Sequence, residues 1–138
     1  MNQHSELFHS INQTSRHYSK LLNEKLVPLG LYAAQWSIIF LLKRDGALSQ
    51  KEISLYLGVE APTMTRTLIR MEKSGWINRA TGNDKREKMI QLTAASDNEY
   101  PKWINAVREA EEATLENVNE EEINGFLNTM KKLKNNLE

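Results

Sequence analysis

Residues 49–93 read SQKEISLYLGVEAPTMTRTLIRMEKSGWINRATGNDKREKMIQLT. This stretch predicts a short helix, a turn, a second helix, and then two strands joined by a basic loop. Ser49 followed by Glu52 has the pattern of a capping box, which satisfies backbone N–H groups at the start of a helix. Gly58 is suited to end that helix, because glycine readily takes the left-handed backbone that follows a last turn. The order of elements is that of a winged helix-turn-helix.

The second helix is expected to begin near Pro62, since proline costs little in a first helical turn. Met64, Leu68 and Met71 recur at helical spacing and predict its buried face. The opposite face carries hydroxyl and basic side chains, with one proline: Pro62, Thr63, Thr65, Arg66, Arg70 and Lys73. Arginine can grip guanine through two hydrogen bonds in the major groove of DNA, and threonine can contact a base edge or a methyl group. A solvated amphipathic helix is the alternative interpretation of this face.

A β-wing is predicted over residues 76–92, as two short strands around a loop with turn-forming residues. Lys85 and Arg86 lie in this loop, and Arg86 is placed to enter a minor groove, whose negative potential attracts arginine. Asp84 is expected to support the wing by pairing with Arg79 or Arg86. An ordinary hairpin with exposed charges is the alternative.

The chain resembles the multiple-antibiotic-resistance regulator (MarR) family of bacterial transcription factors. Four motifs carry the resemblance: T-x-T-R at 63–66, L-I-R-M-E-K-S-G at 68–75, D-x-R at 84–86 and L-T at 92–93. The resemblance implies a single mainly α domain over residues 1–138 with a small β-wing. Its DNA-binding part would span residues 31–93, with the helix-turn-helix at about 49–74. Residues 1–29 and 95–138 would then form the dimerisation helices.

Two features depart from the family pattern. Glu60 stands where the family usually has a serine that caps the recognition helix, and glutamate caps less well, although its charge suits a helix N-terminus. Residues 94–101 read AASDNEYP, where the family commonly starts a long helix with a glycine a few residues in. Pro101 cannot lie inside a helix without a kink or a break. We therefore expect this helix to begin near Asn98, or at Thr93 with a bend.

The charge distribution favours a DNA partner although the formal net charge is zero. Residues 61–88 hold seven Lys/Arg against three Asp/Glu, a net charge of +4. Residues 95–138 hold five against ten, a net charge of −5, and residues 1–60 hold six against five. The basic charge is thus concentrated in the predicted reading unit, which would orient the molecule toward a phosphate backbone.

The flanking helices carry apolar stripes that are broad for lone surface helices. They are expected over residues 6–27, 33–44, 98–118 and from Asn119, with Glu122 as its capping partner, to Leu137. The stripes of the first and last helices favour burial against a second copy of the chain. Packing within one chain is the alternative.

Several classes of function lack support in the sequence. The absence of cysteine excludes a disulfide framework, a thiolate zinc site and the cysteine-based peroxide sensing of some family members. The three histidines, His4, His9 and His17, lack metal-ligand spacing, and no glycine-rich phosphate loop occurs. We expect no catalytic site, metal or cofactor. No secretory signal or long apolar run occurs, which predicts a soluble cytoplasmic protein.

The sequence predicts a homodimeric regulator that binds a near-palindromic site in double-stranded DNA, with Ser49, Gln50 and Lys51 adding phosphate contacts. Family resemblance favours a repressor released by a small aromatic or anionic effector. Arg16, His17 and Trp36 are the candidate effector residues, although Trp36 is also suited to the core. The alternative function is a winged-helix module that binds protein through the same surface. The operator, the regulated genes and the effector are not readable from the chain.

Overall fold

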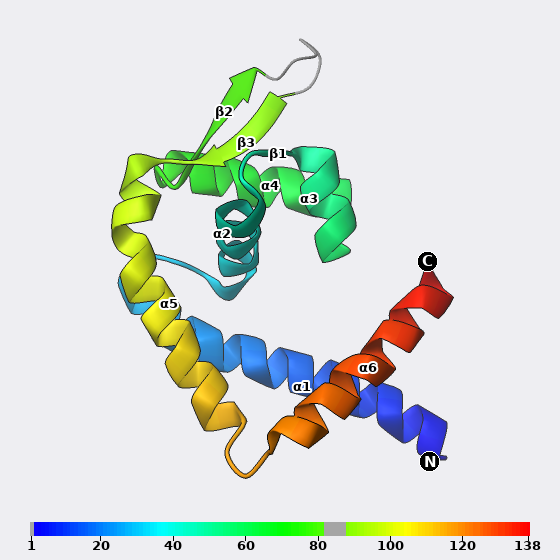
Figure 1. Cartoon of the computed structure of the whole chain (residues 1–138). Coiled ribbons are helices and arrows are strands. Elements are labelled where there is room, and N and C mark those ends of the chain that lie inside the picture. The colour runs from blue at the N-terminus through cyan, green and yellow to red at the C-terminus, as the bar shows by residue number, and fades with distance from the viewer. Residues whose placement is uncertain (1, 82–87) are drawn as a thin grey trace.

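The computed structural model describes residues 2–81 and 88–138. Its elements in chain order are α1 (Gln3–Leu26), the 3-10 turn η1 (Val27–Leu29), α2 (Ala33–Asp45), β1 (Leu48–Ser49), α3 (Gln50–Leu57), α4 (Ala61–Lys73), β2 (Ile77–Thr81), β3 (Lys88–Leu92), α5 (Ala94–Thr114) and α6 (Glu120–Leu137). The segment from α2 to β3 forms one compact body, from which α1, α5 and α6 extend (Figure 1). A mainly helical fold with a small sheet is confirmed.

The helix ends follow local capping chemistry. Asn2 caps α1, where its side chain accepts a hydrogen bond of 2.8 Å from the Ser5 N–H. The predicted capping box of Asn119 and Glu122 is present at α6, with bonds of 3.1 and 2.8 Å. Gly58 ends α3 at φ 66°, in the left-handed region that glycine tolerates at no steric cost.

Helix α5 resolves the two starts that the sequence left open. It begins at Ala94, with Thr93 as its cap, and carries Pro101 inside it. The start near Asn98 is therefore wrong, and the long helix with an internal proline is present. Figure 1 shows α5 curving along its length, which agrees with the backbone hydrogen bond that a proline removes. The helix ends at Thr114, a few residues earlier than expected.

The sheet has three antiparallel strands in the order β1-β3-β2. Ile77 pairs with Leu92 at one end of the β2–β3 register, and Leu48 of β1 pairs with Ile90. The side chains of Ile77 and Ile90 are both buried. The sheet is thereby anchored to the same core as the helices.

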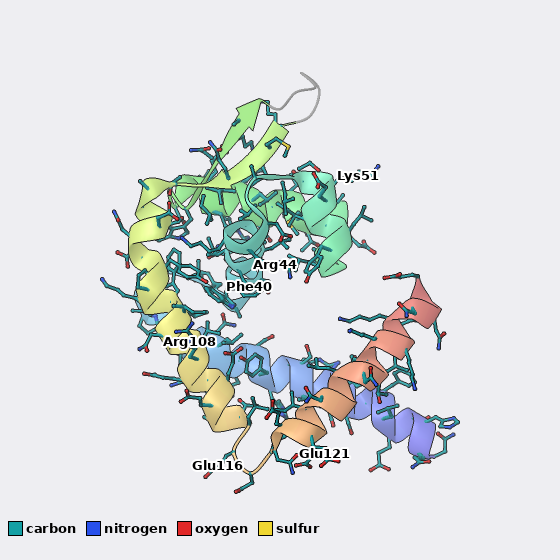
Figure 2. All side chains as sticks on the ribbon, viewed as in Figure 1. Phe40, Arg44, Lys51, Arg108, Glu116 and Glu121 are labelled. Atoms are coloured by element: carbon teal, nitrogen blue, oxygen red, sulfur yellow. The ribbon has the colours of Figure 1, made fainter. Side chains whose placement is uncertain are left out.

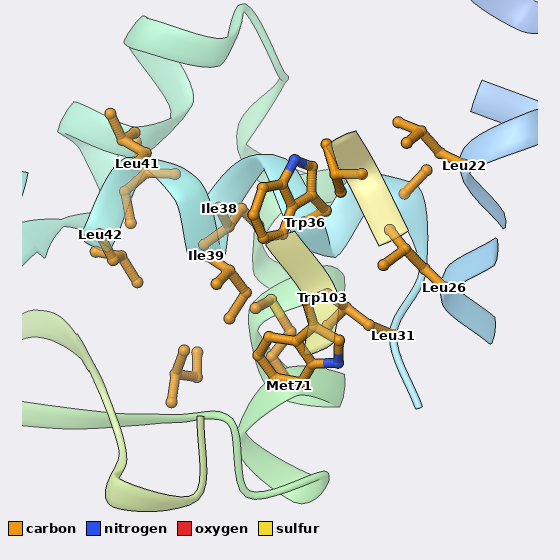
Figure 3. Close-up of a cluster of buried hydrophobic side chains, with 14 of the residues drawn as sticks. Leu22, Leu26, Leu31, Trp36, Ile38, Ile39, Leu41, Leu42, Met71 and Trp103 are labelled. Carbon is orange, nitrogen blue, oxygen red and sulfur yellow. The ribbon is translucent and has the colours of Figure 1, made fainter. Parts of the chain in front are cut away.

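The hydrophobic core lies between the end of α1, α2, α4, the sheet and the part of α5 from Trp103 to Ala110 (Figure 3). Its largest fully buried side chains are Trp103, Leu26, Leu31, Ile38, Ile39, Leu41, Ile53, Met64, Leu68, Met71, Ile77 and Ile90. Helix α6 contributes no buried residue. The core therefore holds the winged helix-turn-helix against the middle of α5, and α6 lies outside it.

Within the described ranges, no single helix is long and apolar enough to cross a membrane. The segments Gln3–Leu29 and Ala33–Asp45 meet that length and composition only as a pair, and they are bent by 79° relative to each other.

Candidate nucleic-acid interface

The first helix of the reading unit starts with the predicted capping box. The Ser49 hydroxyl accepts from the Glu52 N–H at 3.1 Å, and the Glu52 carboxylate accepts from the Ser49 N–H at the same distance. Ser49 is 2% exposed. Its side chain therefore caps α3 rather than facing solvent. Gln50 is half-buried and Lys51 is exposed.

Helix α4 presents the two faces that its sequence predicts. Met64, Leu68 and Met71 are at most 1% exposed and anchor the helix in the core. The residues predicted to face DNA are all exposed: Pro62, Thr63, Thr65, Arg66, Arg70 and Lys73. Because the apolar stripe fixes the rotation of the helix, these side chains share an outward orientation.

Hydrogen bonds order part of this outer face. Gln50 Nε2 donates to Thr65 Oγ1 at 2.7 Å, and the same hydroxyl donates to the Ala61 carbonyl at 2.9 Å. Thr65 thus joins α3 to α4, and its hydroxyl is occupied. Arg66 Nη2 donates to Thr63 Oγ1 at 3.3 Å, which uses one of the five guanidinium N–H donors. Among residues 2–81 and 88–138, the other donors of Arg66 stay free for a base edge or a phosphate.

The N-terminus of α4 has no side-chain cap. Glu60 has the extended backbone of a cap residue, φ −68° and ψ 150°, but its side chain makes no capping hydrogen bond. Free N–H groups at a helix start attract anions, including phosphate oxygens. The departure noted in the sequence thus leaves this end of the reading helix open to a partner.

Arg70 lies one turn beyond Arg66 and borders a cavity of about 310 Å³. The cavity is lined by Tyr32, Ala34, Gln35, Thr67 and Arg70. Arg70 therefore lies where the reading helix faces the start of α2.

The described part of the wing is bonded to the reading helix and across its own strands. Arg79 pairs with Glu72 of α4, with Arg79 Nε 3.8 Å from Glu72 Oε1. This ion pair ties β2 to the reading helix, and the sequence reasoning missed it. Gln91 Nε2 also donates to Asn78 Oδ1 across the strands at 2.7 Å. The predicted wing residues Asp84, Lys85 and Arg86 lie outside the described residues.

Three surface residues, Arg44, Asp45 and Tyr56, link α3 to the end of α2. Arg44 of α2 binds Asp45 through two hydrogen bonds of 2.8 and 3.0 Å, donates to the Tyr56 hydroxyl at 2.9 Å and lies 4.8 Å from the centre of that ring. The hydrogen bonds from Arg44 hold the pKa of the Asp45 carboxyl below its usual value. Tyr56 is 60% exposed. Its contact with Arg44 connects α3 to α2.

The three candidate effector residues lie on two helices, α1 and α2. Arg16 and His17 are exposed on α1. Trp36 of α2 is 7% exposed and stacks on Tyr100 of α5, with ring centres 5.8 Å apart and an interplanar angle of 27°. Trp36 is therefore a core residue, which is the alternative that the sequence left open.

Charge is segregated along the molecule. Lys51 projects from α3 at one end, whereas Glu116 and Glu121 lie at the turn between α5 and α6 (Figure 2). In the described part of the chain, no group of three or more His, Asp or Glu side chains is placed to hold a metal ion. The arrangement is suited to binding an extended anion at the α3–α4 end.

Comparison with known proteins identifies the family. A model of the MarR family matches residues 31–88. The HTH-type transcriptional regulator YwoH of Bacillus subtilis (strain 168), described as uncharacterized, is 43% identical over 120 residues, which cover 87% of this chain and 88% of that protein. The chain belongs to the MarR family. The multiple antibiotic resistance protein MarR of Escherichia coli (strain K12) is 34% identical over 88 residues, covering 63% of this chain and 59% of that protein.

Solved structures agree with this membership. A mutant MarR from E. coli complexed with operator DNA matches with a TM-score of 0.81 and 27% identity, over 94% of this chain and 91% of that one. The apo form of wild-type MarR from E. coli matches with a TM-score of 0.75 and 26% identity, over 96% and 98%. This MarR-family protein is a sequence-specific DNA-binding transcriptional regulator.

Proposed function

We propose that the protein acts as a homodimer in which two α4 helices read two half-sites of a near-palindromic operator. The observation that carries the proposal is the exposed hydroxyl and basic face of α4, whose opposite face is fixed in the core. Two-fold symmetric proteins of this class place their reading helices in successive major grooves, roughly 34–36 Å apart. The operator complex of the E. coli relative supports the same use of the fold.

Within each half-site, Arg66 and Thr63 are assigned to base edges, because both are exposed in the first turns of α4 and Arg66 keeps free donors. Pro62 and Thr65 offer apolar contact to a thymine methyl group. Gln50, Lys51, Arg70 and Lys73 are assigned to the phosphate backbone. From the sequence pattern, Lys85 and Arg86 are assigned to the wing contact with the minor groove.

The dimer surface is proposed to consist of α1 and α6. Large apolar side chains are exposed there: Leu7, Phe8, Phe126, Leu127 and Leu137 are between 42% and 83% exposed. Ile11, Ile123, Met130 and Leu133 are half-buried on the same two helices. A contiguous apolar surface of this kind is typical of a protein–protein interface, and closed two-fold symmetry is the commonest way to cover it.

Repression and its release by a small anionic aromatic molecule form the finer part of the proposal. A dimer that covers two half-sites blocks other proteins from that DNA, and a ligand that prefers a conformation with misplaced reading helices would empty the site. Arg16 and His17 offer charge and hydrogen bonds for such a ligand. Trp36 would add an aromatic contact only in a conformation that uncovers its ring, which is stacked on Tyr100. A thermal-shift screen of phenolic acids on wild type, Arg16→Ala and Trp36→Ala tests this part. Hits that stabilise all three proteins equally would remove these residues from the site.

We propose that the protein works in the cytoplasm and has no catalytic role. The test of the proposed function is selection of bound sequences from a random pool of duplex DNA. We expect an inverted repeat with its two halves about one helical turn apart. An enriched single half-site without a repeat would overturn the dimeric mode of binding.

A further inference from the structure

Two tryptophans distant in sequence meet at the turn that follows α1. Trp76 Nε1 donates to the Gly30 carbonyl at 3.2 Å, and Trp103 Nε1 donates to the Leu29 carbonyl at 3.1 Å. The two rings contact edge to face, with centres 4.9 Å apart and an angle of 88°. The carbonyls of Leu29 and Gly30 therefore each accept a hydrogen bond from a tryptophan, one in α5 and one just before β2.

The turn itself depends on glycine. Gly30 has φ 83°, a conformation that other residues adopt at a cost, and a Cβ at this position would lie 3.5 Å from the Trp76 ring. The Trp103 side chain is fully buried and the Trp76 side chain is half-buried. The hydrogen bond of Trp103 is the more protected of the two, and breaking it would leave a partly buried polar group unsatisfied.

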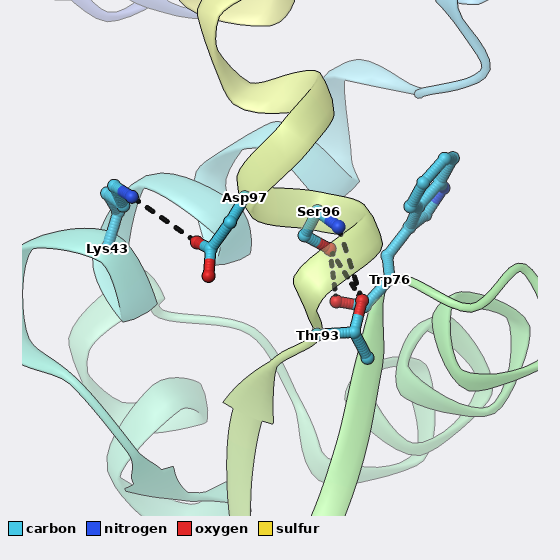
Figure 4. Close-up of polar contacts among 5 residues, drawn as sticks. All are labelled: Lys43, Trp76, Thr93, Ser96 and Asp97. Atoms are coloured by element: carbon cyan, nitrogen blue, oxygen red, sulfur yellow. Dashed lines mark hydrogen bonds and ion pairs between the residues drawn. The ribbon is translucent and has the colours of Figure 1, made fainter.

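The backbone of Gly75 and Trp76 is also hydrogen-bonded to the start of α5, and we call these contacts and the two tryptophans the tryptophan junction. The Thr93 N–H donates to the Trp76 carbonyl at 3.2 Å, and the Thr93 hydroxyl donates to the Gly75 carbonyl at 2.6 Å. The hydroxyl of Ser96, which is 1% exposed, also donates to the Trp76 carbonyl (Figure 4). The loop that leaves the reading helix is thus bonded to the first turn of α5.

A second polar connection, between α2 and α5, is an exposed ion pair. Lys43 contacts Asp97 at 3.3 Å, with side chains 43% and 56% exposed (Figure 4). Exposed ion pairs of this kind contribute little rigidity, because water and salt screen them. The tryptophan junction is therefore the firmer polar connection between the reading unit and the helices that leave it.

We infer that Trp76 and Trp103 are positioning residues that fix the direction of α4 relative to α1 and α5, and so set the half-site spacing that the protein accepts. The inference rests on the dimer proposed above, in which α1 and α6 meet a second copy. Each added base pair moves one half-site by about 3.4 Å along the helix axis and turns it by about 35°. A rigid junction makes the protein sensitive to that change, whereas a loosened junction lets each reading helix follow its half-site.

The first experiment measures affinity for the selected operator and for versions with one or two base pairs added or removed at its centre. Wild type is expected to lose about tenfold in affinity per base pair, because either the DNA or the junction must deform. Trp76→Phe and Trp103→Phe, which remove the indole N–H, are expected to lose less than about threefold while binding an isolated half-site as wild type does. Benzothienylalanine at position 103 keeps the ring shape without the N–H and serves if the phenylalanine variant unfolds.

Tyr100→Phe is the matched control. Tyr100 of α5 also contacts the reading unit, by stacking on Trp36, and the substitution keeps the ring while it removes a polar group. It is expected to keep the wild-type spacing profile. A uniform loss across all spacings for the junction variants, or an equal flattening in Tyr100→Phe, would overturn the inference.

A second measurement needs no DNA. The chain has no cysteine, so Lys73→Cys carries one spin label per protomer at the end of α4. Pulsed electron resonance on the dimer is expected to give a narrow distance distribution, which Trp76→Phe and Trp103→Phe broaden. Unchanged widths in a dimeric protein would contradict the inference and leave the dimer standing. Monomeric wild type in sedimentation would instead remove the dimer, and with it the inference.

Discussion

Arg66 is exposed near the start of α4, where it contacts the Thr63 hydroxyl at 3.3 Å and keeps other donors free. Arg66→Ala is expected to weaken binding to the selected operator by about 1–3 kcal/mol and to relax preference at one position per half-site. Competition between operator and random duplex measures both effects. Arg108→Ala, an exposed arginine on α5, is the matched control and should leave affinity unchanged. An equal loss on operator and random DNA would show that Arg66 contacts only phosphate.

Asp45 provides a test of the cluster behind α3. Hydrogen bonding by Arg44 lowers the pKa of Asp45 in the folded protein relative to the unfolded chain, where it is about 3.9. Its contribution to stability is therefore present above that pH and is lost as the pH falls through the folded pKa. Arg44→Gln should return the pKa of Asp45 to its ordinary range, as measured by carboxyl NMR titration. Tyr56→Phe, which removes only the second partner of Arg44, should change it less. An unchanged Asp45 pKa in Arg44→Gln would contradict this account.

Single residues also show where sequence reasoning stops. The hydroxyls and basic side chains of α4 are predictable, because three apolar residues at helical spacing fix which face turns outward. The capping role of Ser49 is predictable from its spacing to Glu52, whereas the burial of its side chain is not. The ion pair of Arg79 with Glu72 of α4 was not expected from the sequence. Such pairings depend on tertiary geometry that no local pattern contains.

At the scale of elements, α4 begins without a side-chain cap. Glu60→Ser would supply one, worth about 1 kcal/mol, and would remove a favourable charge near the helix N-terminus, worth about 0.3–1 kcal/mol. We expect a net gain of about 0.5 kcal/mol in the free energy of unfolding, measured in urea. Glu60→Ala loses the charge and gains no cap, so it should be destabilising. If serine stabilised no better than alanine, the geometry at this helix start would not accept a cap.

Element boundaries were predictable where a residue with a special backbone or a cap decides them. Gly58 and the pairs Ser49–Glu52 and Asn119–Glu122 behave as their chemistry dictates. The start of α5 was left open, because Pro101 permits both a new helix and a bent one, and the cap offered by Thr93 decides for the longer helix. The tryptophan junction was not foreseen. Trp103 has the spacing of an ordinary core residue, and only the fold brings the turn at Gly30 to it.

At the scale of the whole molecule, the apolar surface of α1 and α6 calls for a partner. Phe126→Asp and Leu133→Asp should place unpaired charges in the dimer interface, where desolvation makes them costly. Sedimentation should then show monomers, and operator affinity should collapse because one half-site alone binds weakly. Leu55→Asp is the matched control, since Leu55 is 74% exposed on α3 and lies outside that surface. Dimers that persist in both α6 variants would place the interface elsewhere.

The proposed dimer would use the charge distribution of the chain. Acidic residues gather in the C-terminal helices and basic residues in the reading unit, so a two-fold assembly through α1 and α6 would present two basic surfaces to the duplex. Affinity should then fall steeply with salt, since each phosphate contact releases counterions.

Hydroxyl-radical footprinting of the selected operator tests the central claim most directly. Two reading helices on one face of the duplex predict two protected regions of similar extent, centred about one helical turn apart, with flanking protection from the wings. A single protected half-site at saturating protein concentration would contradict the account, because it would show that one reading unit binds without its symmetry mate.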